Sequence, residues 1–153
     1  MTAGQDRLFA TQQDQLTSDD YYTPQHVFDA LDIRFDLDVC APPGGSHTVP
    51  ADNYLTQLED GLLAPWHGRV WMNPPYSNVT PWVSKFINHA NGICLVPHSK
   101  SAWHIVLFES DARICAPRHG YFDFIGGPIF MPIVFAAFGD ECIAALERIG
   151  KVR

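Results

Sequence analysis

Short apolar runs separated by amphipathic segments dominate the pattern of this chain. Residues 69–72, 93–97 and 132–138 are mostly apolar and rich in β-branched and aromatic side chains. Such continuous runs predict strands that are buried on both faces of a sheet. Residues 35–41 alternate well enough to predict another strand, and residues 52–56 predict a brief one.

Two Thr-Pro pairs mark expected helix starts, because threonine is a good N-cap and proline is favoured at the first helical position. The pair at residues 23–24 precedes apolar positions that share one face of a helix of roughly nine residues. The pair at residues 80–81 begins a second helix, which Asn91-Gly92 is expected to end. Two more helices are predicted, over residues 102–108 and from Asp140 through Ile149.

The order of these elements predicts an α/β fold with a mixed, mostly parallel sheet and helices on both faces. The late part of the chain adds short strands at residues 113–116 and 121–124, with residues 125–128 as a loop. Residues 46–58 hold only the one brief strand, whereas a full βαβ unit needs about 30 residues. The fold is therefore expected to be abbreviated after its first strand.

Length and composition favour one cytosolic domain. We assign residues 19–153 to a single domain, preceded by a mobile, glutamine-rich arm over residues 1–18 with a possible short helix at 8–15. No apolar run reaches the ~18 residues that span a membrane, and no secretory signal is evident. The four cysteines are scattered, which indicates reduced thiols.

The charge is distributed unevenly. The net charge of −7 argues against a protein that holds nucleic acid by bulk electrostatics. Residues 1–60 carry 11 acidic and 2 basic side chains, whereas residues 61–153 carry 6 acidic and 8 basic ones. The acidic first part could serve a cationic cofactor. Four basic side chains could meet phosphate: Lys85, Lys100, Arg113 and Arg118.

The strand at residues 69–72 runs into Asn73-Pro74-Pro75-Tyr76. The two prolines stop the strand and stiffen the turn that follows it, at the end of a strand where open α/β sheets bind ligands. The Asn73 side-chain carbonyl and the Pro74 backbone carbonyl can hold one amino group, and Tyr76 offers a flat face. This arrangement fits methylation of an amine on a planar substrate, although an ordinary Pro-Pro turn would have the same spacing.

A second candidate site follows the strand at residues 35–41. Asp38 lies near its end, and the loop Pro42-Pro43-Gly44-Gly45 could let a nucleoside approach the backbone. Asp38 could accept from a cofactor ammonium or a ribose hydroxyl, and Asp60 could contact an adenine. For both carboxylates an exposed position at an ordinary turn is the alternative.

Together these motifs resemble the phage-type DNA N6-adenine methyltransferase family, often labelled Dam, over roughly residues 20–138. The resemblance rests on Tyr22-Thr23-Pro24-Gln25, the Asp-Leu-Asp-Val-Cys-Ala strand at 36–41, Asp60-Gly61-Leu62 with Trp66, the Trp-Met-Asn-Pro-Pro-Tyr-Ser segment at 71–77, Trp82-Val83, and Leu95-Val96-Pro97. It implies a Rossmann-like fold that uses S-adenosylmethionine (SAM).

The resemblance also implies roles for individual residues. Asn73, Pro74, Pro75 and Tyr76 match the catalytic turn. The expected cofactor contacts are Tyr22, Thr23, Pro24, Asp38, Cys40, Ala41, Asp52 and Asp60. The expected substrate contacts are Tyr76, Ser77, Lys100 and Arg118. The chain departs from the family pattern in its Pro-Pro-Gly-Gly loop, in lacking a firm counterpart of the acidic residue after a second strand, and in lacking a separate recognition domain.

The implied reaction is transfer of the SAM methyl group to N6 of a flipped-out adenine in double-stranded DNA. No metal is expected, since none of the seven histidines pair at the i, i+4 spacing of a metal site. A protein glutamine amide or an RNA base is the alternative acceptor, and a non-catalytic relic that binds SAM or DNA is a further alternative. The family implies a phage or prophage protein in the host cytoplasm, and the choice between monomer and homodimer stays open.

Overall fold

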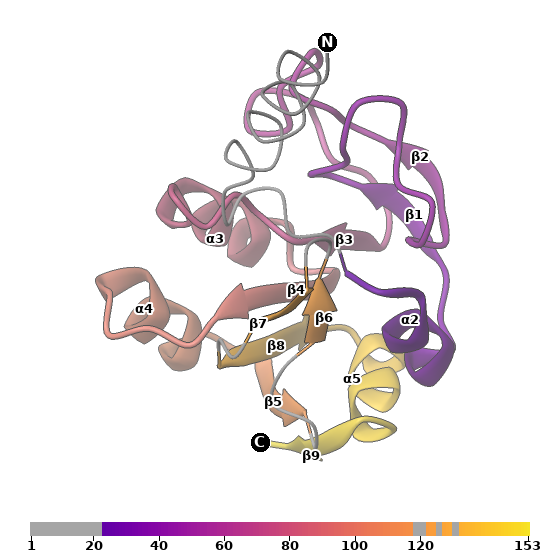
Figure 1. Cartoon of the computed structure of the whole chain (residues 1–153). Coiled ribbons are helices and arrows are strands. Elements are labelled where there is room, and N and C mark those ends of the chain that lie inside the picture. The colour runs from indigo at the N-terminus through magenta and orange to yellow at the C-terminus, as the bar shows by residue number, and fades with distance from the viewer. Residues whose placement is uncertain (1–22, 118–121, 125–126, 130–131) are drawn as a thin grey trace, which may run out of the picture.

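The computed structural model describes residues 23–117, 122–124, 127–129 and 132–153. The predicted arm at residues 1–18, the possible helix at 8–15, Tyr22 and Arg118 lie outside the described residues. Seven strands form one sheet in the order β2-β1-β3-β4-β8-β5-β9 (Figure 1). Their bounds are Phe35–Asp38 for β1, Ala51–Tyr54 for β2, Val70–Met72 for β3, Gly92–Pro97 for β4, Arg113–Pro117 for β5, Ile133–Phe138 for β8 and Gly150–Val152 for β9.

The sheet is mixed, and the expectation of mostly parallel pairing is wrong. Strand β1 is parallel to β2 and β3, and β3 is parallel to β4. Strand β8 is antiparallel to both of its neighbours, β4 and β5, and β9 is antiparallel to β5. The reason is the return path, because the chain goes from β5 to β8 through a hairpin instead of a helical crossover. Strands β1 to β5 nevertheless all run in one direction.

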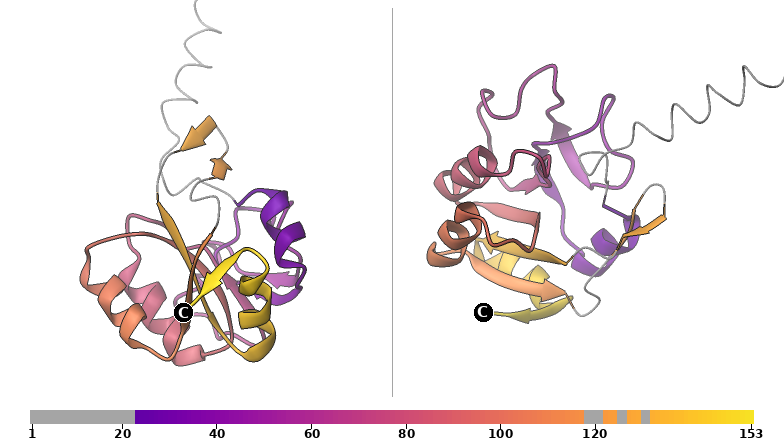
Figure 2. Two further views of the ribbon diagram at one scale, coloured as in Figure 1. Left: turned by 90° about the horizontal axis from the view of Figure 1, so that it is seen from below. Right: turned by 60° about the vertical axis from the view of Figure 1, so that its left-hand side comes forward.

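That hairpin consists of β6 (Phe122–Phe124) and β7 (Gly127–Ile129), which pair antiparallel as a separate small sheet. Both views in Figure 2 show it outside the seven-stranded sheet. Strand β7 forms where we expected a loop at residues 125–128. Strand β9 was not predicted either, because three residues with a lysine in the middle carry no periodic signal and form a strand only by pairing with β5.

Helices cover both faces of the sheet, as predicted. Helices α2 (Gln25–Leu31) and α5 (Asp140–Glu147) lie on one face, and α3 (Thr80–His89) and α4 (Ala102–Glu109) lie on the other (Figure 1). No helix in the described ranges is long and apolar enough to span a membrane.

Alternation along each strand supplies the two apolar faces. In β4, Ile93 and Leu95 pack toward α2 and α5, whereas Cys94 and Val96 pack toward α3 and α4. The continuous apolar run at residues 93–97 is therefore buried on both sides, as its composition predicted. Aromatic contacts tie α2 to the sheet, because the Trp71 ring centroid lies 4.8 Å from that of Phe28.

The helix starts differ from the predicted caps. Helix α2 begins at Gln25, one residue later than expected, with Pro24 in the N-cap position and no side-chain cap. It has seven residues and ends before Asp32, whose φ of 49° is left-handed. Thr80 is the first residue of α3 and not its cap. Thr23 is consequently available for a contact elsewhere in the fold.

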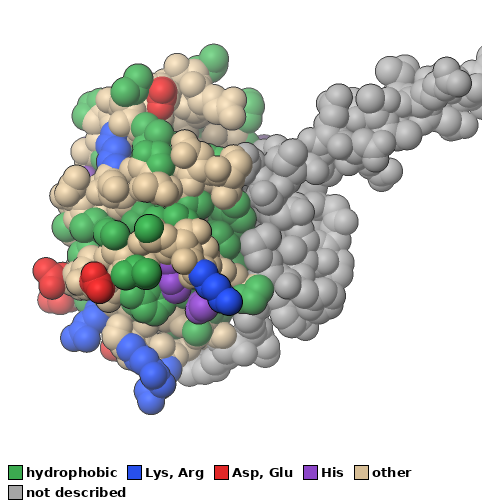
Figure 3. Space-filling view, turned by 90° about the vertical axis from the view of Figure 1, so that its left-hand side faces the viewer, with side chains coloured by type: hydrophobic (Ala, Val, Ile, Leu, Met, Phe, Trp, Pro, Cys, Tyr) green, Lys and Arg blue, Asp and Glu red, His purple; other side chains and the backbone are tan. Residues whose placement is uncertain are grey.

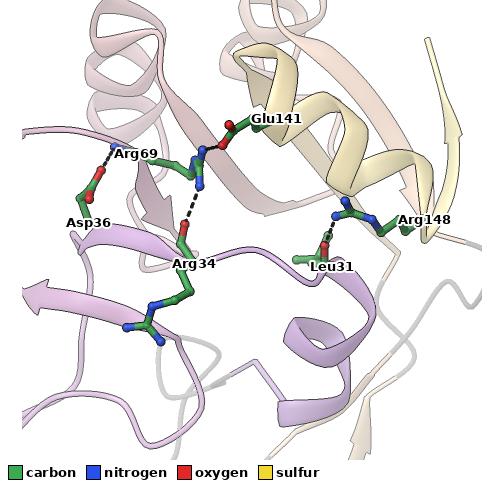
Figure 4. Close-up of polar contacts among 6 residues, drawn as sticks. All are labelled: Leu31, Arg34, Asp36, Arg69, Glu141 and Arg148. Atoms are coloured by element: carbon green, nitrogen blue, oxygen red, sulfur yellow. Dashed lines mark hydrogen bonds and ion pairs between the residues drawn. The ribbon is translucent and has the colours of Figure 1, made fainter.

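Arg69 links three elements around the edge of the sheet (Figure 4). Its backbone N–H donates to Asp36 Oδ2 at 2.7 Å, and its guanidinium donates to the Arg34 carbonyl at 2.9 Å. The same guanidinium pairs with the Glu141 carboxylate of α5. Arg148, at the C-terminal end of α5, donates to the Leu31 carbonyl of α2. Arg69 thus ties α5 to the start of β3, and Arg148 ties α5 to α2.

We expect Arg69→Gln to lower the free energy of unfolding by about 1–3 kcal/mol, because a partly buried charged donor to a backbone carbonyl is lost. Arg34→Gln is the matched control. The ion pair of Arg34 with Asp52 is 69% and 60% exposed at its two side chains, so its loss should cost at most about 1 kcal/mol. Urea denaturation measures both values, and equal losses would contradict the structural role of Arg69.

Candidate active site

A cavity of about 480 Å³ lies at the edge of the sheet where β1 and β3 end. Because these strands are parallel, the segments that follow them meet at this edge. The cavity is lined by residues 39–43 after β1, by Thr56, Gln57, Asp60 and Gly61 after β2, by Asn73 and Pro75 after β3, and by Trp82 of α3. The cavity thus joins two predicted sets of residues, Cys40, Ala41 and Asp60 from the cofactor set and Asn73 and Pro75 from the catalytic turn.

Asn73 is held by a residue that is distant in sequence. Its Nδ2 donates to Thr23 Oγ1 at 3.3 Å, across 50 positions of sequence. Thr23 is 3% exposed, and its carbonyl accepts from the Thr48 hydroxyl at 2.7 Å. The hydroxyl that we expected to cap α2 is instead the acceptor that orients the Asn73 amide. The contact places the Thr23-Pro24 segment beside the turn, as a shared site requires.

The rest of the turn is stiff and partly buried. Pro74 is buried, Pro75 lines the cavity, and the Asn78 N–H donates to the Pro75 carbonyl at 3.1 Å. Ser77 is exposed on the same turn. The backbone carbonyl of Pro74 is therefore part of a rigid segment and has a fixed direction.

Tyr76 is turned inward more than the sequence suggested. Its Oη is buried and has no hydrogen-bond partner among the described residues. Burial raises the pKa of the Tyr76 hydroxyl above its ordinary value, and the nearby Cys94 thiol raises it further. The hydroxyl is therefore neutral, and Tyr76 does not line the cavity. The polar end of Tyr76 therefore does not reach a ligand in the cavity.

Asp38 is a buried carboxyl group at the end of β1, where it is 4% exposed and accepts from the Cys40 N–H at 3.2 Å. Burial raises the pKa of Asp38 from 3.8 to about 7, although the Cys40 N–H partly opposes this shift. Burial, and next the charge of Asp38, raise the pKa of the Cys40 thiol well above its usual value. A cation bound nearby would favour the ionised carboxylate of Asp38.

Lys85 of α3 holds the loop in which Asp60 and Gly61 line the cavity. Its Nζ donates to the carbonyls of Gly61 at 3.0 Å and Leu62 at 2.9 Å, and also to the Ala64 carbonyl. It lies 4.9 Å from the Trp66 ring centroid, and Trp66 Nε1 donates to the Gly61 carbonyl at 2.7 Å. Our expectation that Lys85 meets phosphate is therefore wrong, because its ammonium is occupied by the loop.

Gly61 can only be glycine in this wall. A Cβ atom there would lie 2.3 Å from the Val39 carbonyl oxygen and 2.7 Å from the Trp82 ring. Asp60, just before it, has a φ of 58° and accepts from the Leu62 N–H at 3.0 Å. The close approach of this loop to β1 brings Asp60 to the cavity.

Some predicted residues are not brought to the cavity. Asp52 is exposed on β2 and pairs with Arg34 at 2.8 Å, so the structure gives it no place in the cavity wall. Lys100 is exposed between β4 and α4. Sequence reasoning missed Thr56, Gln57 and the role of Lys85, since these depend on a loop whose path has no periodic signal. Within the described part of the chain, no three His, Cys, Asp or Glu side chains form a group that could hold a metal ion.

The fold and the site define an α/β protein with a ligand cavity at the carboxyl ends of parallel strands. Residues 10–128 match the family model described as DNA N-6-adenine-methyltransferase (Dam), which covers more than half of the chain. The chain belongs to this family.

One curated relative shows how far the similarity extends. A DNA N-6-adenine-methyltransferase of Haemophilus phage HP1 (strain HP1c1) is 41% identical over 73 residues, which cover 44% of this chain and 40% of the phage protein. The match thus spans less than half of the length of this relative. No solved structure matches the chain significantly.

We expect Lys85→Met to weaken SAM binding about tenfold or more, a loss of about 1.4 kcal/mol, because three loop carbonyls lose their common donor. It should also lower the free energy of unfolding by about 2 kcal/mol. Lys100→Met removes the same charge from an exposed site and should change stability by less than about 0.5 kcal/mol. Calorimetry and urea denaturation test both variants, and wild-type SAM affinity in Lys85→Met would contradict the role of this wall.

Proposed function

We propose that this chain is a SAM-dependent methyltransferase with a Rossmann-like fold, which methylates N6 of adenine in double-stranded DNA. The observation that carries the proposal is the shared cavity, which is lined both by Cys40, Ala41 and Asp60 and by Asn73 and Pro75. Membership in the Dam family and similarity to the DNA N-6-adenine-methyltransferase of phage HP1 support the same reaction.

The cavity suits the cofactor. Its volume of about 480 Å³ lies in the range of small-molecule pockets. Asp60 lines the cavity, and the buried Asp38 directly precedes Val39 in its wall, so two carboxyl groups lie at or next to a site for a ligand that carries sulfonium and ammonium cations. Cys40, Ala41 and the loop at 42–43 offer small and rigid surfaces to an adenosine. Bound SAM would supply an electrophilic methyl group.

The chain's own part in the reaction is to position the amine. Donation from Asn73 Nδ2 to Thr23 fixes the plane of the amide, and the Asn73 carbonyl and the Pro74 backbone carbonyl would then accept the two hydrogens of N6. Two acceptors hold the amino group and draw its lone pair out of conjugation with the ring. The rate gain comes from orientation and from fixed dipoles.

The target adenine must leave the duplex to reach this cavity. Flipping costs a few kcal/mol, and stacking on an aromatic ring returns about 1–3 kcal/mol per base. Tyr76 is the aromatic side chain of the turn. Because its hydroxyl is buried beside Cys94, we assign it a role through its ring face alone.

We expect Asn73→Ala to lower methyl transfer by about 100-fold or more, the usual cost of removing one preorganised polar contact to the reacting group. SAM affinity should stay within about threefold of wild type, because Asn73 orients the acceptor amine. The measurement is incubation with SAM and unmethylated duplex DNA, digestion to nucleosides and mass spectrometry of N6-methylated adenine. Asn53→Ala, on exposed β2, is the matched control and should retain full activity.

The same assay separates the alternatives. Near-wild-type activity of Asn73→Ala would contradict its role. A wild-type protein that binds SAM but leaves DNA unmethylated would act on another planar acceptor, such as a protein glutamine amide or an RNA base. Absence of SAM binding would make the chain a non-catalytic relic. Tyr76→Phe should stay active, since it keeps the ring and removes only an unpartnered hydroxyl.

SAM binding should weaken as the pH falls below about 7. The ionised form of Asp38 attracts the cationic cofactor, and its pKa of about 7 means that acid neutralises it in this range. One linked proton gives at most about a tenfold loss of affinity per pH unit. Calorimetry between pH 5 and pH 8 should show this slope in the wild type, and weaker but flatter binding in Asp38→Asn.

The ligand-free protein should show the opposite trend in stability. The folded-state pKa of Asp38 lies above its unfolded value of 3.8, so its contribution is fully present below pH 3.8 and is lost as the pH rises to about 7. Asp38→Asn should remove this dependence. A wild-type melting temperature with the same pH profile as Asp38→Asn would contradict the buried carboxyl.

A further inference from the structure

The basic side chains of the described residues fall into two groups of four. One group is used inside the fold: Arg34 pairs with Asp52, Arg69 with Glu141, and Lys85 and Arg148 donate to backbone carbonyls. The other group makes no ion pair and no side-chain hydrogen bond within the described part of the chain, and all of its members are exposed. These side chains are Lys100, Arg113, Lys151 and Arg153.

Three members of this second group line one groove. A hollow of about 840 Å³ lies beside the end of α4, over the outer strands β5 and β9 and next to Val134 of β8. Ile114, Val134 and Phe108 form its apolar part. Arg113, Lys151 and Arg153 supply its cations, and among the described residues Asp111 is the one acidic side chain in its lining. We call this the cationic groove.

Figure 3 shows the face that contains the groove. Lys and Arg side chains lie at the lower edge of this face, beside acidic side chains, and histidines lie beside another basic side chain. His98, which directly follows β4, lines the groove as well. The groove therefore begins near the edge of the sheet at which Asn73 follows β3.

The distance from the catalytic turn suits a duplex. Strand order places β3 and β9 four strand spacings apart, which is roughly 19 Å at about 4.8 Å per spacing. One turn of B-DNA is about 34 Å long and carries a negative charge about every 1.7 Å. A duplex whose target base reaches Asn73 would therefore pass phosphates along these cations within a single turn.

We infer that the cationic groove binds the phosphate backbone of the substrate duplex beside the flipped base. This inference rests on the proposed function. Charge favours DNA over a second copy of this chain, because the groove gathers unpaired cations whereas the chain as a whole carries −7. A basic groove on an otherwise acidic protein orients the duplex, because phosphate is attracted to the groove.

The test is fluorescence anisotropy of the full chain with a labelled 30-base-pair duplex over a series of salt concentrations. Lys151→Gln should reduce the slope of log affinity against log salt by about 1. The triple variant Arg113→Gln, Lys151→Gln, Arg153→Gln should reduce it by about 3. Arg34→Gln, which also removes one charge, should leave the slope unchanged because Arg34 is already paired.

A wild-type slope in the triple variant, with its thermal unfolding unchanged, would overturn the inference. A triple variant that turns a dimer into a monomer on sedimentation while keeping that slope would overturn it as well, and would assign the groove to a second copy. Methyl transfer is measured separately. Reduced slopes without any methylation of DNA would support the groove as a DNA-binding surface and refute the proposed function. Methylation of DNA with unchanged slopes would support the proposed function and refute the groove.

Discussion

The hydrogen bond from Asn73 Nδ2 to Thr23 Oγ1 is the contact on which the geometry of the site depends. It joins the end of β3 to the residue before α2, and α2 is itself packed on Trp71 in the middle of β3. The orientation of the Asn73 amide therefore depends on the same core packing that positions β3. A prolyl turn alone would fix the backbone but not the plane of the Asn73 side chain, which this hydrogen bond fixes.

Burial shapes the electrostatics of this site more than charge pairing does. Asp38 lies below the surface with one backbone donor, and its pKa rises accordingly. In contrast, the Lys85 ammonium donates to three carbonyls and thereby holds the loop that contains Gly61. Asp38 is thus a buried carboxyl group beside the cavity, and Lys85 holds the loop that forms part of the cavity wall.

The sequence predicted those features that depend on local pattern. The apolar runs predicted β3, β4 and β8, and the order of elements predicted helices on both faces. The turn at Asn73 was predicted from its prolines. Partners distant in sequence could not be predicted: the Asn73–Thr23 bond, the Lys85 clamp and the position of Asp52 away from the cavity depend on tertiary packing. The direction of β8 was not predicted, because the apolar run of this strand looks the same whether a hairpin or a helical crossover precedes it.

Net charge also does not describe the surface that a partner meets, because that surface depends on tertiary packing. The total of −7 counts every side chain equally. Of the eight basic side chains in the described residues, however, four form ion pairs or hydrogen bonds within the fold. The other four are exposed and make no such contact there. Three of those four share one groove. A partner experiences the local field and not the sum, because salt screens charges that lie more than about 10 Å away. An acidic chain can therefore present a basic surface, provided that its other cations are paired internally.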